Sequence, residues 1–103
     1  MAVIKVTSDN FNKEVLNSEK PVLADFNANW CGPCRMLKPI VEEISEENPN
    51  VKVVSINIDE ENELADEYNI SAIPCLILFK GGAEFDRCVG LRPKAALTEF
   101  IGE

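Results

Sequence analysis

The chain has 103 residues, a formal net charge of -8 and an isoelectric point near 4.5. Its hydrophobic fraction of 46% is typical of a globular protein and excludes a disordered one, so we expect residues 1–103 to form a single domain. The excess of acids argues against nucleic acid or an anionic membrane as a partner, because phosphate binding needs clustered Lys and Arg.

Strand and helix patterns alternate along the chain. In chain order they predict a strand at 3–7, a helix at 9–17, a strand at 22–26, a helix from the cysteines to about 48, a strand at 51–58, a helix at 59–68, strands at 75–80 and 84–89, and a helix from 93. Gly81-Gly82 predicts a hairpin between the last two strands. This order predicts an α/β layer with parallel strands and an antiparallel edge.

Two of the four cysteines lie between a buried strand and a helix start, in Cys31-Gly32-Pro33-Cys34. The free N–H groups and the dipole of a helix N-terminus stabilise a thiolate. We expect Cys31 to be the exposed nucleophile and Cys34 to face inward, where it can attack a mixed disulfide on Cys31. Gly32 permits a close turn and Pro33 restricts it.

A metal site and a structural disulfide are the alternatives for this pair. A zinc site usually needs four ligands, but the sequence has no histidine, and the other cysteines, Cys75 and Cys88, are single and far apart. The N-terminus has no signal-peptide pattern, and no apolar run approaches the roughly 20 residues of a membrane span. We therefore expect a cytoplasmic protein without a membrane partner, where a static disulfide is disfavoured.

The whole sequence resembles the thioredoxin family. The residues that carry the resemblance are Asp25-Phe26, Ala28, Trp30-Cys31-Gly32-Pro33-Cys34, Ile73-Pro74, Phe79-Lys80-Gly81-Gly82 and Val89-Gly90. The Cys-x-x-Cys spacing alone is a weak signal, whereas Trp-Cys-Gly-Pro-Cys followed by Ile-Pro about 40 residues later is strong. The resemblance implies a thioredoxin fold, a five-stranded mixed sheet of order 1-3-2-4-5 flanked by four helices.

The resemblance also implies the reaction, which is the reduction of protein disulfides by dithiol exchange. Cys31 attacks the substrate, Cys34 resolves the mixed disulfide, and the pair is left as a redox-active Cys31–Cys34 disulfide. A separate thioredoxin reductase restores the dithiol, so no bound cofactor and no metal is expected, and the protein is expected to be a monomer. The alternatives are a disulfide oxidant or isomerase of the same fold and a redox-switched protein-docking module.

Further site residues follow from the resemblance. Asp25 is a buried acid behind Cys34 that transfers its proton, although a carboxylate turned to a polar edge is the alternative. Pro74 is a cis-proline that faces the cysteines, and the backbone of Ile73 pairs with an extended substrate. The expected substrate groove comprises Trp30, Gly32, Pro33, Ile73, Pro74 and Gly90.

The chain departs from the family pattern at two positions near the predicted site. Asn27 stands where many thioredoxins carry Trp, and Ser55 aligns with a position that is often Lys. Asn27 either supplies a hydrogen bond or admits water. Cys75, directly after Pro74, is either a small buried side chain or a third thiol that modulates the pair, and Cys88 has no predicted partner.

Overall fold

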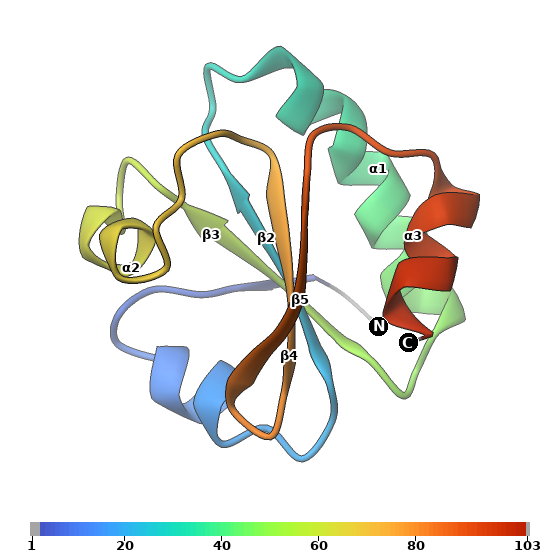
Figure 1. Ribbon diagram of the computed structural model, residues 1–103, viewed down its shortest axis with the longest axis horizontal. Coiled ribbons are helices and arrows are strands. Elements are labelled where there is room, and N and C mark those ends of the chain that lie inside the picture. Colours follow the sequence, from blue (N-terminus) through green and yellow to red (C-terminus); the bar gives the residue numbers. More distant parts are fainter. Residues whose placement is uncertain (1–2, 103) are drawn as a thin grey trace.

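The computed structural model describes residues 3–102, which form one five-stranded sheet with helices on both faces (Figure 1). The strands are β1 (Ile4–Lys5), β2 (Val22–Asn27), β3 (Lys52–Asn57), β4 (Cys75–Lys80) and β5 (Ala83–Val89). The helical segments are η1 (Asn12–Leu16), α1 (Gly32–Glu47), α2 (Asn62–Glu67) and α3 (Lys94–Ile101). Among the described residues no helix combines the length and the apolar character that crossing a membrane requires.

The strand order is β1-β3-β2-β4-β5, which confirms the predicted topology. β3 pairs in parallel with β1 and β2, whereas β4 is antiparallel to both β2 and β5. One row of paired residues crosses all five strands: Lys5, Ser55, Asp25, Leu76 and Cys88. The sheet register therefore places Asp25 of the central strand directly beside Ser55.

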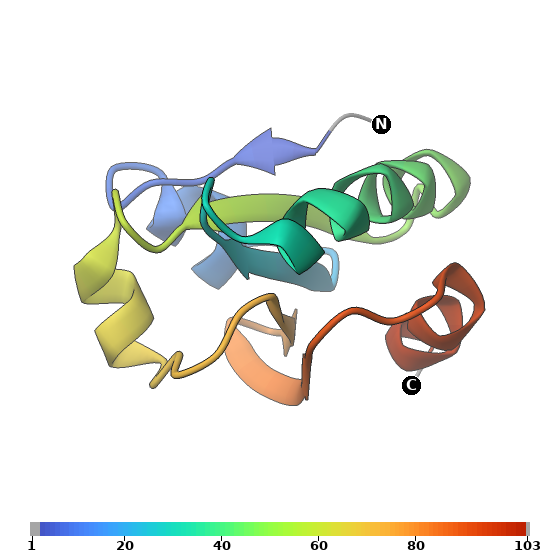
Figure 2. The same cartoon turned by 90° about the horizontal axis from the view of Figure 1, so that it is seen from above.

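The apolar strand residues alternate between two cores. Figures 1 and 2 show α1 and α3 on one face of the sheet and η1 and α2 on the other. Leu23 packs into the core beneath α1 and α3, while Ala24 and Phe26 pack into the core beneath η1 and α2. This double burial explains why the sequence of β2 is apolar on both faces, and it leaves Asp25 on the face of α1.

The N-terminal elements are shorter than the sequence predicts. The predicted strand at 3–7 contracts to two residues: among the described residues, Ile4 and Lys5 are in register with β3, and the N–H of Val6 adds one hydrogen bond to the carbonyl of Ser55 at 2.9 Å. The predicted helix at 9–17 is one π-helical turn, in which the carbonyl of Asn12 accepts both the backbone N–H and the side-chain amide of Asn17 at 2.9 Å. The Asn17 side chain thus adds a second donor to a carbonyl five residues earlier, which is the spacing of a π-helical hydrogen bond.

Candidate active site

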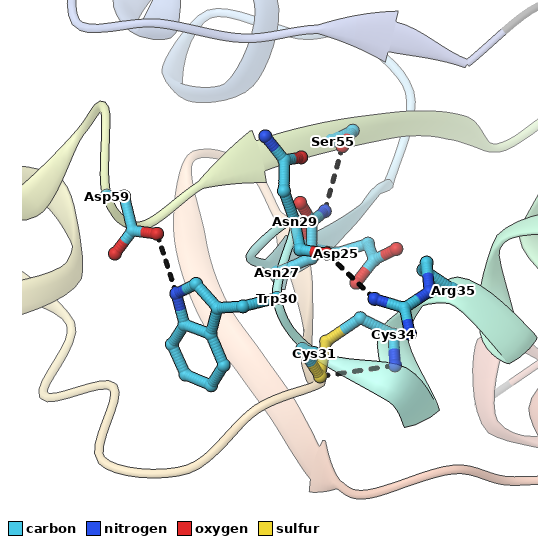
Figure 3. The surroundings of a disulfide bond; sticks show 9 residues. All are labelled: Asp25, Asn27, Asn29, Trp30, Cys31, Cys34, Arg35, Ser55 and Asp59. Carbon is cyan, nitrogen blue, oxygen red and sulfur yellow. Dashed lines mark hydrogen bonds between the residues drawn. A yellow bond between two sulfur atoms is a disulfide. The ribbon is translucent and has the colours of Figure 1, made fainter.

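The two cysteines lie where β2 gives way to α1 (Figure 3). Cys31 is the N-cap of α1 with extended backbone, and its Sγ accepts a hydrogen bond from the backbone N–H of Cys34 at 3.2 Å. Cys31 and Cys34 form a disulfide with a Cα–Cα distance of 5.2 Å, within the usual range for a disulfide. The sulfur of Cys31 thus occupies the place of a capping oxygen at a 16-residue helix.

The exposure of the two cysteines differs from our expectation. We predicted an exposed Cys31 and an inward Cys34, but each residue is only 5% exposed. Both lie in a small apolar cluster with Ala28, against which Ile58 and Ile73 pack. Because the covering loops bury Cys31 as deeply as Cys34, the two sulfurs are distinguished by their helix position and neighbours instead.

Gly32 is less important for the turn between the cysteines than the sequence predicts. Gly32 has no positive φ, and a Cβ at this position would meet only the Arg35 side chain, at 3.9 Å. The backbone therefore does not require glycine here, which corrects the predicted role of Gly32 in a close turn. Pro33 lies in the first turn of α1, where its missing N–H leaves no hydrogen bond unmade.

Asp25 is a buried acid on the central strand. The residue is 4% exposed, and its Oδ1 has no hydrogen-bond partner among the described residues. Burial raises the pKa of Asp25 from 3.8 to about 7, and the neighbouring Asn27 amide opposes that rise. A carboxyl in this position can gain or lose a proton near neutral pH.

The two departures from the family pattern are in direct contact. Nδ2 of Asn27 donates one hydrogen bond to Oγ of Ser55 and another to the backbone carbonyl of Asp25, both at 2.9 Å. Asn27 and Asp25 share a face of β2 because they are two residues apart. Of the two alternatives for Asn27, the structure shows the hydrogen bond, and Asn27 makes it to the backbone of Asp25 and to the side chain of Ser55.

A cleft of about 830 Å³ opens beside these residues, on the α1 face of the sheet. Both Asp25 and Cys34 line it, together with the Asn27–Ser55 pair. Its remaining lining consists of Val3, Lys5, Ala28, Asn29, Arg35, Lys38, Val41, Glu42, Asn57 and Glu60. Asp25 and Cys34 therefore line one cleft, and Figure 3 shows the two side chains near each other.

Trp30 lies on the outer side of the site and is 68% exposed. Its indole Nε1 donates a hydrogen bond to Oδ2 of Asp59 at 2.8 Å (Figure 3). Trp30 is thus an exposed side chain held against the loop after β3, rather than a core aromatic.

A second backbone segment approaches the cysteines from β4. The Ile73–Pro74 peptide bond is cis, as predicted. The N–H of Gly90 donates to the carbonyl of Pro74 at 2.8 Å, and Gly90 has a φ of +97°, which L side chains rarely adopt. The backbone N–H and carbonyl of Ile73 have no hydrogen-bond partner within the described chain. They can therefore pair with an extended ligand.

The remaining cysteines lie on opposite faces of the sheet. Cys75 is 1% exposed and belongs to the core beneath η1 and α2, whereas the partly buried Cys88 packs against the core beneath α1 and α3. Burial raises the pKa of both thiols. Within residues 3–102, no three His, Cys, Asp or Glu side chains form a group that could hold a metal.

Three neighbours of the site escaped the sequence prediction. Ile58 packs on the cysteine cluster, Asp59 holds Trp30, and Nη1 of Arg35 donates to the carbonyl of Asn29 at 2.8 Å. The sequence offered a signal for two of them: Ile58 and Asp59 directly follow a parallel strand, and functional loops gather at the carboxyl ends of such strands.

Comparisons with known proteins give one consistent result. The family model described as Thioredoxin matches residues 2–103. Thioredoxin 1 of Nostoc sp. is 48% identical over 101 residues, covering 97% of this chain and 94% of the relative. The thioredoxins of Rickettsia felis and Pyropia yezoensis are 50% and 46% identical, covering 95% and 100% of this chain and 94% and 97% of theirs.

Proposed function

The chain belongs to the thioredoxin family and is a thiol-disulfide oxidoreductase that reduces protein disulfides, and from that premise we propose roles for its individual residues. Cys31 is the nucleophile, Cys34 is the resolving thiol and Asp25 transfers the proton. Residues 1–103 act as a single domain. The observation that carries this proposal is the Cys31–Cys34 disulfide at the start of α1, with Asp25 and Cys34 lining one cleft.

The role of Cys31 is supported by its place at the helix N-terminus. Its Sγ accepts the backbone N–H of Cys34, and the positive end of the dipole of α1 favours negative charge on that sulfur. A thiolate at Cys31 is therefore stabilised before the substrate arrives.

The reaction proceeds by two exchanges. Sγ of Cys31 attacks the substrate disulfide; a mixed disulfide forms, and the first substrate sulfur leaves with an electron pair and takes up a proton. Sγ of Cys34 then attacks Sγ of Cys31, so the Cys31–Cys34 bond forms as the mixed disulfide breaks. The second substrate sulfur leaves as a thiolate that takes up a proton. The dithiol has lost two electrons and the substrate has gained them.

Asp25 takes part in the second exchange. The proton of the Cys34 thiol must leave when that sulfur attacks, and the Asp25 carboxylate accepts it. The pKa of Asp25, raised to about 7 by burial, suits this task because the group then binds and releases protons at neutral pH.

The substrate lies across the outer face of the cysteine pair. We assign Trp30, Gly32, Pro33, Ile73, Pro74 and Gly90 to this groove. The unpaired backbone groups of Ile73 pair with an extended segment of the substrate, as an added strand would. Trp30 covers the segment from the other side.

Protein disulfides are the substrates, and a thioredoxin reductase recharges the dithiol. The redox-active disulfide is the only redox group that this scheme uses, so the chain works without a bound cofactor. We propose that the protein acts as a cytoplasmic monomer without nucleic-acid or membrane partners, in keeping with its net charge of -8. The thioredoxin names of the relatives do not favour the oxidant, isomerase or docking alternatives.

The proposal is tested by reducing a disulfide-bonded test protein in the presence of a recycling dithiol. The Cys31→Ser variant is expected to lose the catalysed rate, whereas the Cys88→Ser variant keeps it. Catalysis by Cys31→Ser at the wild-type rate would contradict the assignment of the nucleophile.

A further inference from the structure

The cleft behind the cysteine pair lies apart from the outer groove assigned to the substrate. Asp25 and Cys34 line it, but Cys31, Trp30 and Pro74 do not. It also reaches Lys5 and Glu60, whose side chains are 69% and 49% exposed and form an ion pair of 3.1 Å. The cleft therefore extends from the buried acid to the protein surface without passing through the substrate groove.

The inner end of the cleft is polar and incompletely satisfied. Oδ1 of Asp25 is buried without a hydrogen-bond partner among the described residues, which is unfavourable for a polar atom. Water that enters the cleft can satisfy this atom, since the volume of about 830 Å³ far exceeds the space that one water needs. A chain of water from Asp25 outward would also carry a proton.

Two short side chains form part of the cleft wall. Asn27 and Ser55 both line the cleft, and the 2.9 Å hydrogen bond between them fixes the Asn27 amide on the sheet. Ser55 is also the direct neighbour of Asp25 in the sheet register. A long side chain at either position would project into the space next to the acid.

We propose that this cleft is the route by which the Asp25 carboxyl exchanges its proton with solvent, and that it admits small weak acids and bases to the rear of the cysteine pair. This inference rests on the proposed proton transfer by Asp25. Asn27 and Ser55 are positioning residues, because they touch neither substrate nor sulfur and act by leaving the route open.

Charged and titratable groups face Asp25 from several elements. Those that line the cleft are Lys5 of β1; Cys34, Arg35, Lys38 and Glu42 of α1; and Glu60 after β3, whereas the Cys75 thiol of β4 senses the charge of Asp25 from the other face of the sheet. Cations and anions thus both surround the route, and neither sign excludes a small neutral base such as imidazole.

Chemical rescue tests the route. At pH 7, Asp25→Ala is expected to lower the rate of protein-disulfide reduction about a hundredfold, the lower end of what a positioned proton-transfer group contributes. Added imidazole should then raise the rate of this variant in proportion to its concentration, while the wild-type rate stays unchanged. The imidazole enters the cleft and accepts the proton of Cys34 in place of the missing carboxylate.

Filling the cleft supplies the matched control. Asp25→Ala combined with Ser55→Leu should abolish the rescue, whereas Asp25→Ala combined with Ser55→Ala should retain it, because alanine leaves the route open. If urea unfolding shows that leucine at position 55 prevents folding, Asp25→Ala combined with Asn27→Leu replaces it, because leucine at position 27 fills the cleft from the neighbouring strand.

The outcomes separate the two proposals. Asp25→Ala with an undiminished rate would contradict proton transfer by Asp25 itself. A slowed Asp25→Ala variant that imidazole does not rescue, or rescues equally in a folded leucine variant, would overturn the cleft route while leaving the role of Asp25 in place.

Discussion

The indole Nε1 of Trp30 lies 2.8 Å from Oδ2 of Asp59, and this hydrogen bond joins the loop before α1 to the loop after β3. It holds a side chain that is 68% exposed in a defined position beside the cysteine pair. The position of the proposed substrate cover therefore depends on a residue from another strand end.

Replacing Asp59 by Ala is expected to free Trp30 and to weaken substrate binding. We expect KM for a protein disulfide to rise about fivefold, which corresponds to roughly 1 kcal/mol, a typical net hydrogen-bond contribution. Fluorescence anisotropy reports on the same change directly, because Trp30 is the only tryptophan of the sequence. Asp59→Asn keeps an acceptor oxygen, so its KM and its anisotropy should lie between those of the wild type and those of Asp59→Ala. Asp66→Ala, on α2, is the control. Unchanged anisotropy in Asp59→Ala would show that the bond does not hold the indole.

The pKa of Asp25 predicts how stability depends on pH. Between its ordinary pKa of 3.8 and its folded value of about 7, the folded state binds a proton that the unfolded state has lost. The free energy of unfolding therefore falls as pH rises through this window. The loss from this group reaches about 4 kcal/mol above pH 7, since each pKa unit corresponds to about 1.4 kcal/mol.

Urea unfolding of the oxidised protein from pH 4 to 8 measures this dependence, with Asp25→Asn as the comparison. Because both proteins share all other carboxylates, the difference between their unfolding free energies isolates Asp25. Asp25→Asn should gain stability relative to wild type as pH rises. A difference that stays constant with pH would contradict the buried, protonatable state of Asp25.

The hairpin between β4 and β5 allows a matched test of backbone geometry. Gly81 and Gly82 have φ values of +60° and +80°, the left-handed conformation that two-residue hairpin turns require. A Cβ at Gly81 would meet nothing within 4 Å, whereas one at Gly82 would lie 2.6 Å from the carbonyl oxygen of Leu16.

We therefore expect Gly81→Ala to cost about 1 kcal/mol of stability and Gly82→Ala about 3 kcal/mol, because the second adds a backbone clash to the strain of a positive φ. Urea unfolding of the two variants gives both values. Equal losses would show that the contact with Leu16 relaxes freely.

Mild oxidation tests whether Cys75 takes part in the redox chemistry. Cys75 and Cys88 lie on opposite faces of the sheet, and burial raises the pKa of each thiol, which keeps it protonated and weakly nucleophilic. Peptide mapping by mass spectrometry should find the Cys31–Cys34 linkage alone. A disulfide that includes Cys75 would establish a third active thiol.

The sequence was sufficient for the features that depend on local pattern. Apolar runs and helical spacing predicted the sheet and its helices, and the residues around Cys31 and Pro74 identified the family and the cis peptide bond. The lengths of the first two elements were overestimated. β1 is in register with β3 over two residues, and η1 ends where Asn17 donates two hydrogen bonds to the carbonyl of Asn12. Neither limit is visible as a local pattern.

Contacts between distant residues account for most of what the sequence could not predict. Asn27 and Ser55 were recognised separately as unusual, yet their hydrogen bond depends on the register between β2 and β3. The burial of Cys31 was missed because Ile58 and Ile73, from two other loops, pack on it. The sequence therefore indicates the chemistry, and tertiary packing determines the access to it.

The central claim is that Cys31 attacks the substrate and Cys34 resolves the product. Its most direct test is to mix reduced Cys34→Ser and reduced Cys31→Ser separately with a disulfide-bonded test protein and to identify any adduct by mass spectrometry. The account predicts a stable mixed disulfide on Cys31 of the Cys34→Ser variant and little adduct on Cys34 of the Cys31→Ser variant. Equal trapping on Cys34, or an adduct on Cys75 or Cys88 in place of Cys31, would contradict it.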